Sequence, residues 1–136
     1  MSNIEQTLSI IKPDAVERNL ENEIKNMFLN KGFKIIKEKK IQIEKMEAEK
    51  FYKVHETRPF YSDLCAYLSS GPIVVMILEK ENAVLANREL MGSTNPHDAK
   101  EGTIRKKYGI SIDKNSVHGS DSTDNASIEI EFFFKD

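Results

Sequence analysis

The apolar positions along the chain predict alternating strands and helices. Residues 7–12 (TLSIIK) are largely apolar and β-branched and stop before Pro13, which predicts a strand followed by a short turn of helix. Between Leu20 and Phe28, apolar side chains recur at the spacing of one helix face. We therefore expect an amphipathic helix there, ending at Gly32, because glycine commonly follows the last turn of a helix.

The next segments follow the same logic. The Ile-rich residues 33–43 predict a second strand, and the continuous apolar run at 73–78 (IVVMIL) predicts a buried one. Helices are expected at 45–55, 60–69 and 82–91, with a break at Arg58-Pro59. Residues 93–116 are irregular except for a turn of helix near Ile104, and 117–119 form a short last strand.

The C-terminal segment fits two structures. The strict alternation of IEIEF (residues 128–132) is typical of a strand. However, Ser122 can cap a helix, Asp124 suits its first turn, and Ile128 and Phe132 lie four positions apart. We therefore favour a helix over residues 122–134.

The order of these elements predicts the fold class. Two split β–α–β halves around one antiparallel sheet correspond to an α+β, ferredoxin-like βαββαβ domain covered by helices. A chain of 136 residues fits a single domain, which we place at residues 1–136. Because this fold serves many functions, it does not decide the activity.

Composition narrows the classes of protein. A formal net charge of −2 argues against a general binder of nucleic acid or membrane surfaces, which would be basic. The single cysteine, Cys65, excludes an intrachain disulfide and fits a small buried side chain. No apolar run is long enough to span a bilayer and no leader is evident, so we expect a cytoplasmic protein without membrane contacts.

The common nucleotide-binding motifs are missing. The sequence contains neither GxxxxGK[ST] nor GxGxxG, and its histidines (His55, His97 and His118) do not have the spacing of a metal site. One unusual pattern remains at residues 115–122, NSVHGSDS.

This pattern resembles the signature of the nucleoside diphosphate kinase family. Other segments resemble the family in the same order and at its spacing: TLSIIKPDAV (7–16), RPF (58–60), SGP (70–72), NR (87–88), MGSTNP (91–96) and GTIR (102–105). The resemblance implies reversible transfer of the terminal phosphate of a nucleoside triphosphate to a nucleoside diphosphate through a phosphohistidine. It also implies Mg²⁺, brought mainly by the nucleotide phosphates rather than by a protein metal site, and a homo-oligomer, either tetramer or hexamer.

The resemblance assigns the catalytic roles. His118 corresponds to the nucleophile, and a neutral imidazole suits that role because its pKa lies near neutrality. Glu129 corresponds to the carboxylate that orients the imidazole, with Ser120 bridging nearby. Eleven positions separate His118 from Glu129, and a turn followed by about two helical turns would bring them together.

The nucleotide-binding roles also follow from the resemblance. Lys12, Arg88, Thr94 and Arg105 match phosphate ligands, and Lys12 and Asn115 also reach the sugar hydroxyl. Phe60 matches the residue that stacks on the base, with Ile112 on its other side, although core packing is the alternative for both. Stacking tolerates every base, so broad base specificity is expected.

Two other functions remain as alternatives. A nucleotide-binding module for regulation or interaction, with reduced catalysis, would show a broken catalytic set, and here the set is complete. An RNA-binding ferredoxin-like domain would carry aromatic signatures that this sequence lacks. Two departures from the family stand out: Glu21-Asn22 replaces the glycine usual before the first long helix, and the C-terminal extension of longer members is absent.

Overall fold

Strands and helices alternate along the chain largely as the sequence predicts. The structure, a computed structural model, describes residues 4–53, 56–59, 61–111 and 114–134. In chain order its elements are β1 (Ile4–Ile11), α1 (Pro13–Glu17), α2 (Glu21–Asn30), β2 (Lys34–Ile41), α3 (Lys45–Phe51), α4 (Tyr61–Leu68), β3 (Ile73–Glu81), α5 (Ala83–Met91), the 3₁₀-helix η2 (Pro96–Asp98), α6 (Ile104–Tyr108), β4 (Val117–Gly119) and α7 (Thr123–Phe134).

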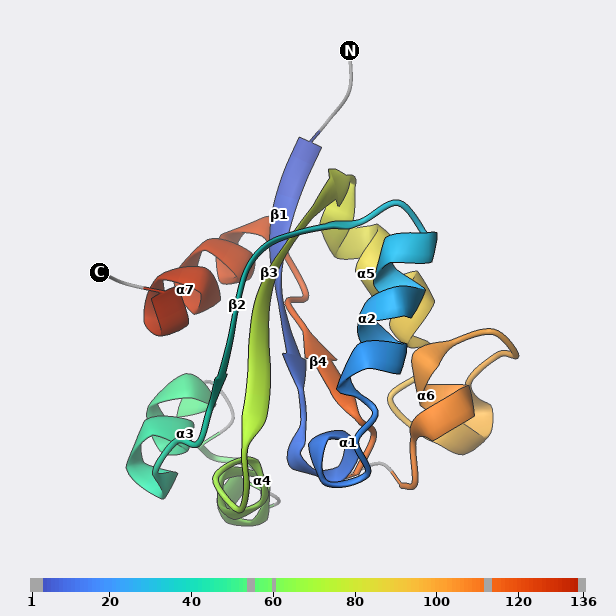
Figure 1. Ribbon diagram of the computed structural model, residues 1–136. Coiled ribbons are helices and arrows are strands. Elements are labelled where there is room, and N and C mark those ends of the chain that lie inside the picture. Colours follow the sequence, from blue (N-terminus) through green and yellow to red (C-terminus); the bar gives the residue numbers. More distant parts are fainter. Residues whose placement is uncertain (1–3, 54–55, 60, 112–113, 135–136) are drawn as a thin grey trace.

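One four-stranded sheet organises the molecule. Its strand order is β2-β3-β1-β4, and every neighbouring pair is antiparallel. The connections from β1 to β2 and from β3 to β4 each pass over a neighbouring strand, and helices lie on both sides of the sheet (Figure 1). This arrangement confirms the predicted α+β, ferredoxin-like fold.

The two faces of the sheet bury separate apolar clusters. Leu8 and Ile10 of β1 face α3, α4 and α7, in a cluster that also contains Cys65. Ile11 points to the opposite face, where it belongs to a cluster that includes Phe28 of α2. Successive side chains of a strand alternate between faces, so β1 supplies both cores. Cys65 is fully buried, as the sequence analysis expects.

The strands differ from prediction in length. β1 begins at Ile4 and β3 ends at Glu81, several residues beyond their apolar runs, because the two backbones stay paired from Ile4 opposite Glu81 to Ile11 opposite Val74. β2 is shorter than predicted and has an irregularity between Ile35 and Lys37. Backbone pairing depends on the neighbouring strand, which a local pattern does not reveal.

Local backbone conformations explain both ends of α2. Asn19, at φ 60°, occupies the left-handed region just before the helix, where asparagine is tolerated better than most residues. The helix therefore forms without the usual glycine. At its other end Gly32 has φ 87°, and the amide of Phe33 donates to the carbonyl of Phe28, which closes the helix as predicted.

The C-terminal segment is helical, which confirms the favoured alternative. The amide of Asn125 donates to Ser122 Oγ over 3.1 Å, so Ser122 caps α7. Phe133 is buried and Phe134 packs against the same cluster, whereas Phe132 keeps 37% of its surface exposed. Phe133 and Phe134 thus contribute to the core, and Phe132 lies at its exposed edge.

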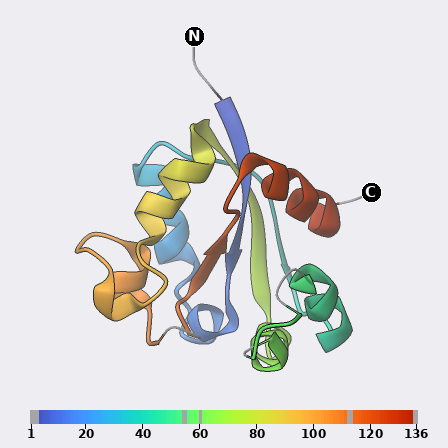
Figure 2. The same ribbon diagram turned by 180° about the vertical axis from the view of Figure 1, so that it is seen from behind.

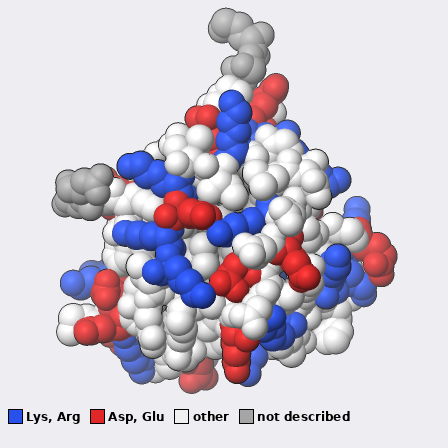
Figure 3. Space-filling view, viewed as in Figure 1, with Lys and Arg blue, Asp and Glu red and all other residues white. Residues whose placement is uncertain are grey.

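The charged side chains do not segregate by sign. On the face shown in Figure 3, lysine and arginine are interspersed with aspartate and glutamate. Within the described part of the chain, no helix combines the length and apolar character needed to cross a membrane.

Candidate active site

His118 in β4 and Glu129 in α7, the helix into which the chain after β4 leads (Figure 2), meet through their side chains. The Nε2 atom of His118 lies 3.0 Å from Oε1 of Glu129, and Ser120 Oγ donates to the same oxygen over 2.7 Å. The helical path of α7 places Glu129 where it can reach back to β4. The structure therefore brings together the three residues predicted to be catalytic.

Ser120 ties this carboxylate to the sheet. The amide of Leu8 in β1 donates to Ser120 Oγ over 3.3 Å, and the amide of Ser120 donates to the carbonyl of Leu8 over 3.2 Å. An ionised carboxylate only accepts hydrogen bonds, so Glu129 fixes the proton of His118 on Nε2. The Nδ1 atom then keeps its lone pair, which is the requirement for a nucleophile.

Aromatic rings surround the imidazole. The Phe51 ring packs edge-on against it with 5.2 Å between centroids, and the Tyr52 centroid lies 6.3 Å away. Burial raises the pKa of Tyr52 far above its usual range, with a further contribution from the charge of Glu129. Tyr52 is thus both a core residue and a neighbour of the site. Phe51 has no distinguishing signal in the sequence.

Close packing of α5 holds β4 in place. A Cβ on Gly119 would lie 2.2 Å from Asn87 Nδ2, so only glycine lets the helix approach the strand this closely. Asn87 is fully buried, and its amide atoms have no hydrogen-bond partner within the described residues. This contact next to His118 is invisible in the sequence because α5 lies about thirty positions away.

Arg88, Thr94 and Arg105 line one open cleft of about 810 Å³. Arg105 is 8% exposed, and its two terminal nitrogens donate to the carbonyls of Gly92 (3.0 Å) and Val117 (2.9 Å). Burial lowers the pKa of Arg105 to about 10, so the guanidinium remains charged at neutral pH. The guanidinium is thereby bonded to β4 at Val117, the residue that immediately precedes His118.

Lys12 and Asn115 form a second anchored pair. Lys12 Nζ donates to Asn115 Oδ1 over 2.9 Å, and Asn115 Nδ2 donates to the carbonyl of Thr94 over 3.2 Å. Both side chains are buried. The end of β1 is thereby joined to the two irregular segments that precede and follow α6.

The predicted base-binding residues cannot be placed. Phe60 and Ile112 lie outside the described residues. Within the described ranges, no three or more histidine, cysteine, aspartate and glutamate side chains gather in a way that could hold a metal ion. The cleft of about 810 Å³ described above is lined by cations, Arg88 and Arg105 among them, and cations suit a polyanionic ligand.

Known sequences resemble nearly the whole chain. The family model described as nucleoside diphosphate kinase matches residues 5–136. A nucleoside diphosphate kinase from Campylobacter jejuni subsp. jejuni is 58% identical over 132 residues, covering 97% of this chain and 96% of the relative. Another from Geotalea uraniireducens is 56% identical over 131 residues, covering 96% of each.

Solved structures agree with the sequences. The nucleoside diphosphate kinase of Aquifex aeolicus superposes with a TM-score of 0.95 at 38% identity, covering 97% of this chain and 96% of that one. The enzyme of Encephalitozoon cuniculi gives 0.94 at 37% identity, covering 97% and 90%. Sequence and backbone thus agree along almost the entire length, and the chain belongs to the nucleoside diphosphate kinase family.

Proposed function

We propose that the chain transfers the terminal phosphoryl group of a nucleoside triphosphate to a nucleoside diphosphate, reversibly and through His118. In the first half, Nδ1 of His118 bonds to the terminal phosphorus as the bond to the bridging oxygen breaks. The electron pair leaves with that oxygen on the departing diphosphate. In the second half, a terminal oxygen of another diphosphate takes the phosphoryl group back, so one site serves both substrates.

The contact between Glu129 and His118 carries this proposal. With the Nε2 proton held by Glu129 over 3.0 Å, the ring directs its Nδ1 lone pair outward. The imidazole becomes cationic once phosphorylated, and the adjacent carboxylate compensates that charge. The His118 side chain keeps 19% of its surface exposed, so a nucleotide can reach it.

The remaining predicted residues would bind the nucleotide. Arg88, Thr94 and Arg105 line the cleft and suit the phosphates, because fixed donors and cations stabilise the charge on the transferred group. Lys12 and Asn115 suit the sugar hydroxyl, with Lys12 also near the phosphates. Phe60 is proposed to stack on the base, which would give broad specificity.

Nucleotide kinases of this family typically use a divalent metal, and we propose Mg²⁺. The described residues hold no cluster of metal-ligating side chains, so the phosphate oxygens would be its main ligands. The ion would neutralise part of the polyphosphate charge. This chain's own cations, Arg88 and Arg105, would supply the rest.

We also propose a homo-oligomer, tetramer or hexamer, in the cytoplasm. Leu29 and Ile36 leave 50% and 42% of their surfaces exposed on α2 and β2, which is apolar surface that a second subunit could cover. Light scattering tests the assembly, and a monomer would contradict it.

Formation of phosphohistidine tests the function directly. After incubation with Mg-ATP, we expect the intact mass to rise by one phosphoryl group that acid removes and alkali spares. Added nucleoside diphosphate should discharge it and yield the triphosphate. Nucleotide binding without any phosphorylation would contradict the proposal and favour a binding module with reduced catalysis.

Ser120→Ala tests how Glu129 is held. The change removes the hydroxyl that donates to Glu129 over 2.7 Å while His118 stays in place. We expect kcat to fall roughly 10- to 150-fold, because a lost hydrogen bond to a charged group costs roughly 1.5–3 kcal/mol. Steady-state kinetics with Mg-ATP measures this. Ser127→Ala, on an exposed position of α7, is the matched control and should leave kcat unchanged.

A further inference from the structure

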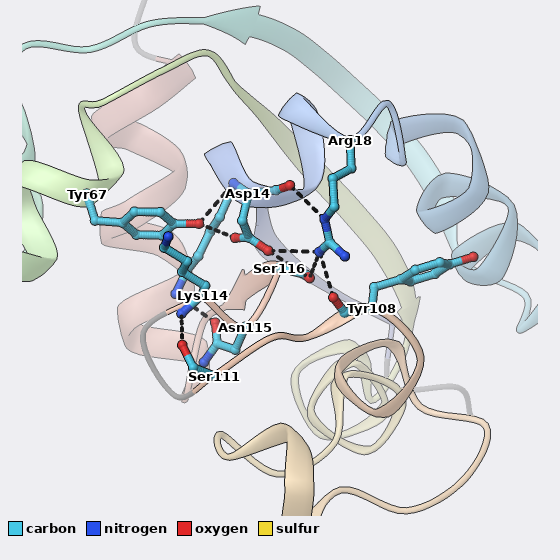
Figure 4. Close-up of polar contacts among 9 residues, drawn as sticks. Asp14, Arg18, Tyr67, Tyr108, Ser111, Lys114, Asn115 and Ser116 are labelled. Atoms are coloured by element: carbon cyan, nitrogen blue, oxygen red, sulfur yellow. Dashed lines mark hydrogen bonds and ion pairs between the residues drawn. The ribbon is translucent and has the colours of Figure 1, made fainter.

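A carboxylate that the mechanism does not use is buried beside the site. Asp14, in the first turn of α1, is 5% exposed. Its Oδ2 accepts from Ser116 Oγ over 3.0 Å and from Arg18 over 3.2 Å, while its Oδ1 accepts from the Tyr67 hydroxyl (Figure 4). Charged groups are rarely buried unless they are paired, and the three donors around Asp14 compensate the burial of its charge.

Arg18, to which the sequence assigns no role, extends the cluster. Its Nε donates to the Asp14 carbonyl over 3.0 Å, and its NH2 group donates to the Tyr108 carbonyl over 2.6 Å. Tyr67 accepts from the Asp14 amide over 2.9 Å, and burial raises the pKa of its hydroxyl far above the usual range. Asp14 therefore connects α1 to α4 through Tyr67, and Arg18 extends the connection to the end of α6.

The same cluster fixes the chain that presents Asn115. Ser116 has φ 74°, a left-handed conformation that is uncommon for residues other than glycine, asparagine and aspartate. Its hydroxyl is bonded to Asp14, and its carbonyl accepts from the Lys12 amide over 2.8 Å. Such conformations persist where the surroundings enforce them, and they mark places where position matters.

The contacts of Asp14 and Ser116 thus fix the backbone next to Lys12 and Asn115. Lys12 is two residues before Asp14, and Asn115 immediately precedes Ser116. The two side chains meet through the 2.9 Å bond from Lys12 Nζ to Asn115 Oδ1. One hydrogen of Asn115 Nδ2 goes to the Thr94 carbonyl, and the other can donate to a sugar oxygen.

We propose that Asp14, together with Arg18 and Tyr67, is a positioning group that sets the Lys12–Asn115 pair for the sugar hydroxyl of the nucleotide. The inference rests on the proposed function, because it concerns the same site. Asp14 itself touches no substrate. It acts through the Ser116 hydroxyl and the backbone of α1, and its loss should affect substrates according to their sugar.

Asp14→Asn tests this by comparing two acceptors. The phosphorylated enzyme is mixed with adenosine diphosphate or with its 2′,3′-dideoxy analogue, and the rate of discharge is followed by rapid quenching. We expect kcat/KM for the ribose acceptor to fall about tenfold or more, since small misplacements of binding groups can cost up to roughly a hundredfold. The dideoxy acceptor, which lacks those hydroxyls, should change much less.

The test is therefore the ratio of kcat/KM for the ribose acceptor to kcat/KM for the dideoxy acceptor, which should fall in the Asp14 variant. An equal loss for both acceptors, or an unchanged ratio, would overturn the proposal and leave Asp14 a structural residue only. Tyr67→Phe is the second test, for use if Asp14→Asn fails to fold. It removes one donor to Asp14 without burying an unpaired charge, and it should also lower the ratio. Phe28→Leu, in the core under α2, is the matched control for destabilisation and should leave the ratio unchanged.

These outcomes separate the inference from the function. If wild-type protein forms no phosphohistidine, the proposed function fails before the comparison begins. If the wild type is phosphorylated and discharged normally but the ratio is insensitive to Asp14 and Tyr67, only the positioning role fails.

Discussion

His118→Ala is expected to lower kcat for phosphoryl transfer by about 10⁴-fold or more, because it removes the atom proposed to bond to phosphorus. The proposed route through one shared site depends on the covalent intermediate, which this variant lacks the imidazole to form. The protein should remain folded: Glu129 keeps its bond from Ser120, and His118 itself is partly exposed. Coupled kinetics and intact mass measure the two parts of this result.

His97→Ala is the matched control for this experiment. His97 is exposed in η2, its amide donates to Asn95 Oδ1, and no role in the site is assigned to its side chain. That variant should be phosphorylated and turn over like the wild type. Substantial transfer by the His118 variant, or labelling that disappears with His97, would show that the nucleophile lies elsewhere.

The general shape of the fold could be predicted from local patterns. The continuous apolar run at 73–78 indicates a strand buried on both faces, and the periodicity between Leu20 and Phe28 indicates a helix that packs on one face. The choice between strand and helix at residues 122–134 was also predictable, because a capping serine at position 122 favours a helix despite the alternating pattern that follows. Strand ends were less predictable, since β1 and β3 extend as far as they pair with each other.

The site was predictable through the resemblance, whereas its supporting contacts were not. The resemblance nominated His118, Ser120 and Glu129, and the structure places them within hydrogen-bonding distance. Arg18 had no assigned role because its partners at Tyr108 and Ser116 are distant in sequence. The burial of Asp14 was equally hidden, since an acidic residue in the first turn of a helix normally has a local explanation.

Arg105 illustrates the same difference. As a residue on a short helix with two neighbouring lysines, it reads as a solvated charge. In the fold it is 8% exposed, because its guanidinium bridges carbonyls from the chain after α5 and from β4. Its planar group carries five donors in a fixed fork, so it can hold both carbonyls with donors left over, whereas a lysine has three donors on one atom and no fork.

Arg105→Met is expected to lower kcat/KM by about 10²- to 10³-fold, the range typical of removing a fixed donor from a developing negative charge. Stability should change much less, within about 2 kcal/mol in either direction. Two carbonyls lose their donors, but a buried charge is also removed, and methionine fills a similar volume. Steady-state kinetics and urea unfolding of the same preparations measure the two effects separately.

Two further variants test whether the loss of kcat/KM depends on the planar guanidinium and on its place at position 105. Lys106→Met removes an exposed charge from the next position of α6, and it should leave both kcat/KM and stability nearly unchanged. Arg105→Lys keeps the charge but cannot span the carbonyls of Gly92 and Val117, so its activity should lie between those of the wild type and Arg105→Met. If the lysine variant is as active as the wild type, charge alone suffices at this position. If the methionine variant retains full activity, Arg105 serves only to join the two segments, and the phosphates must be held by other groups.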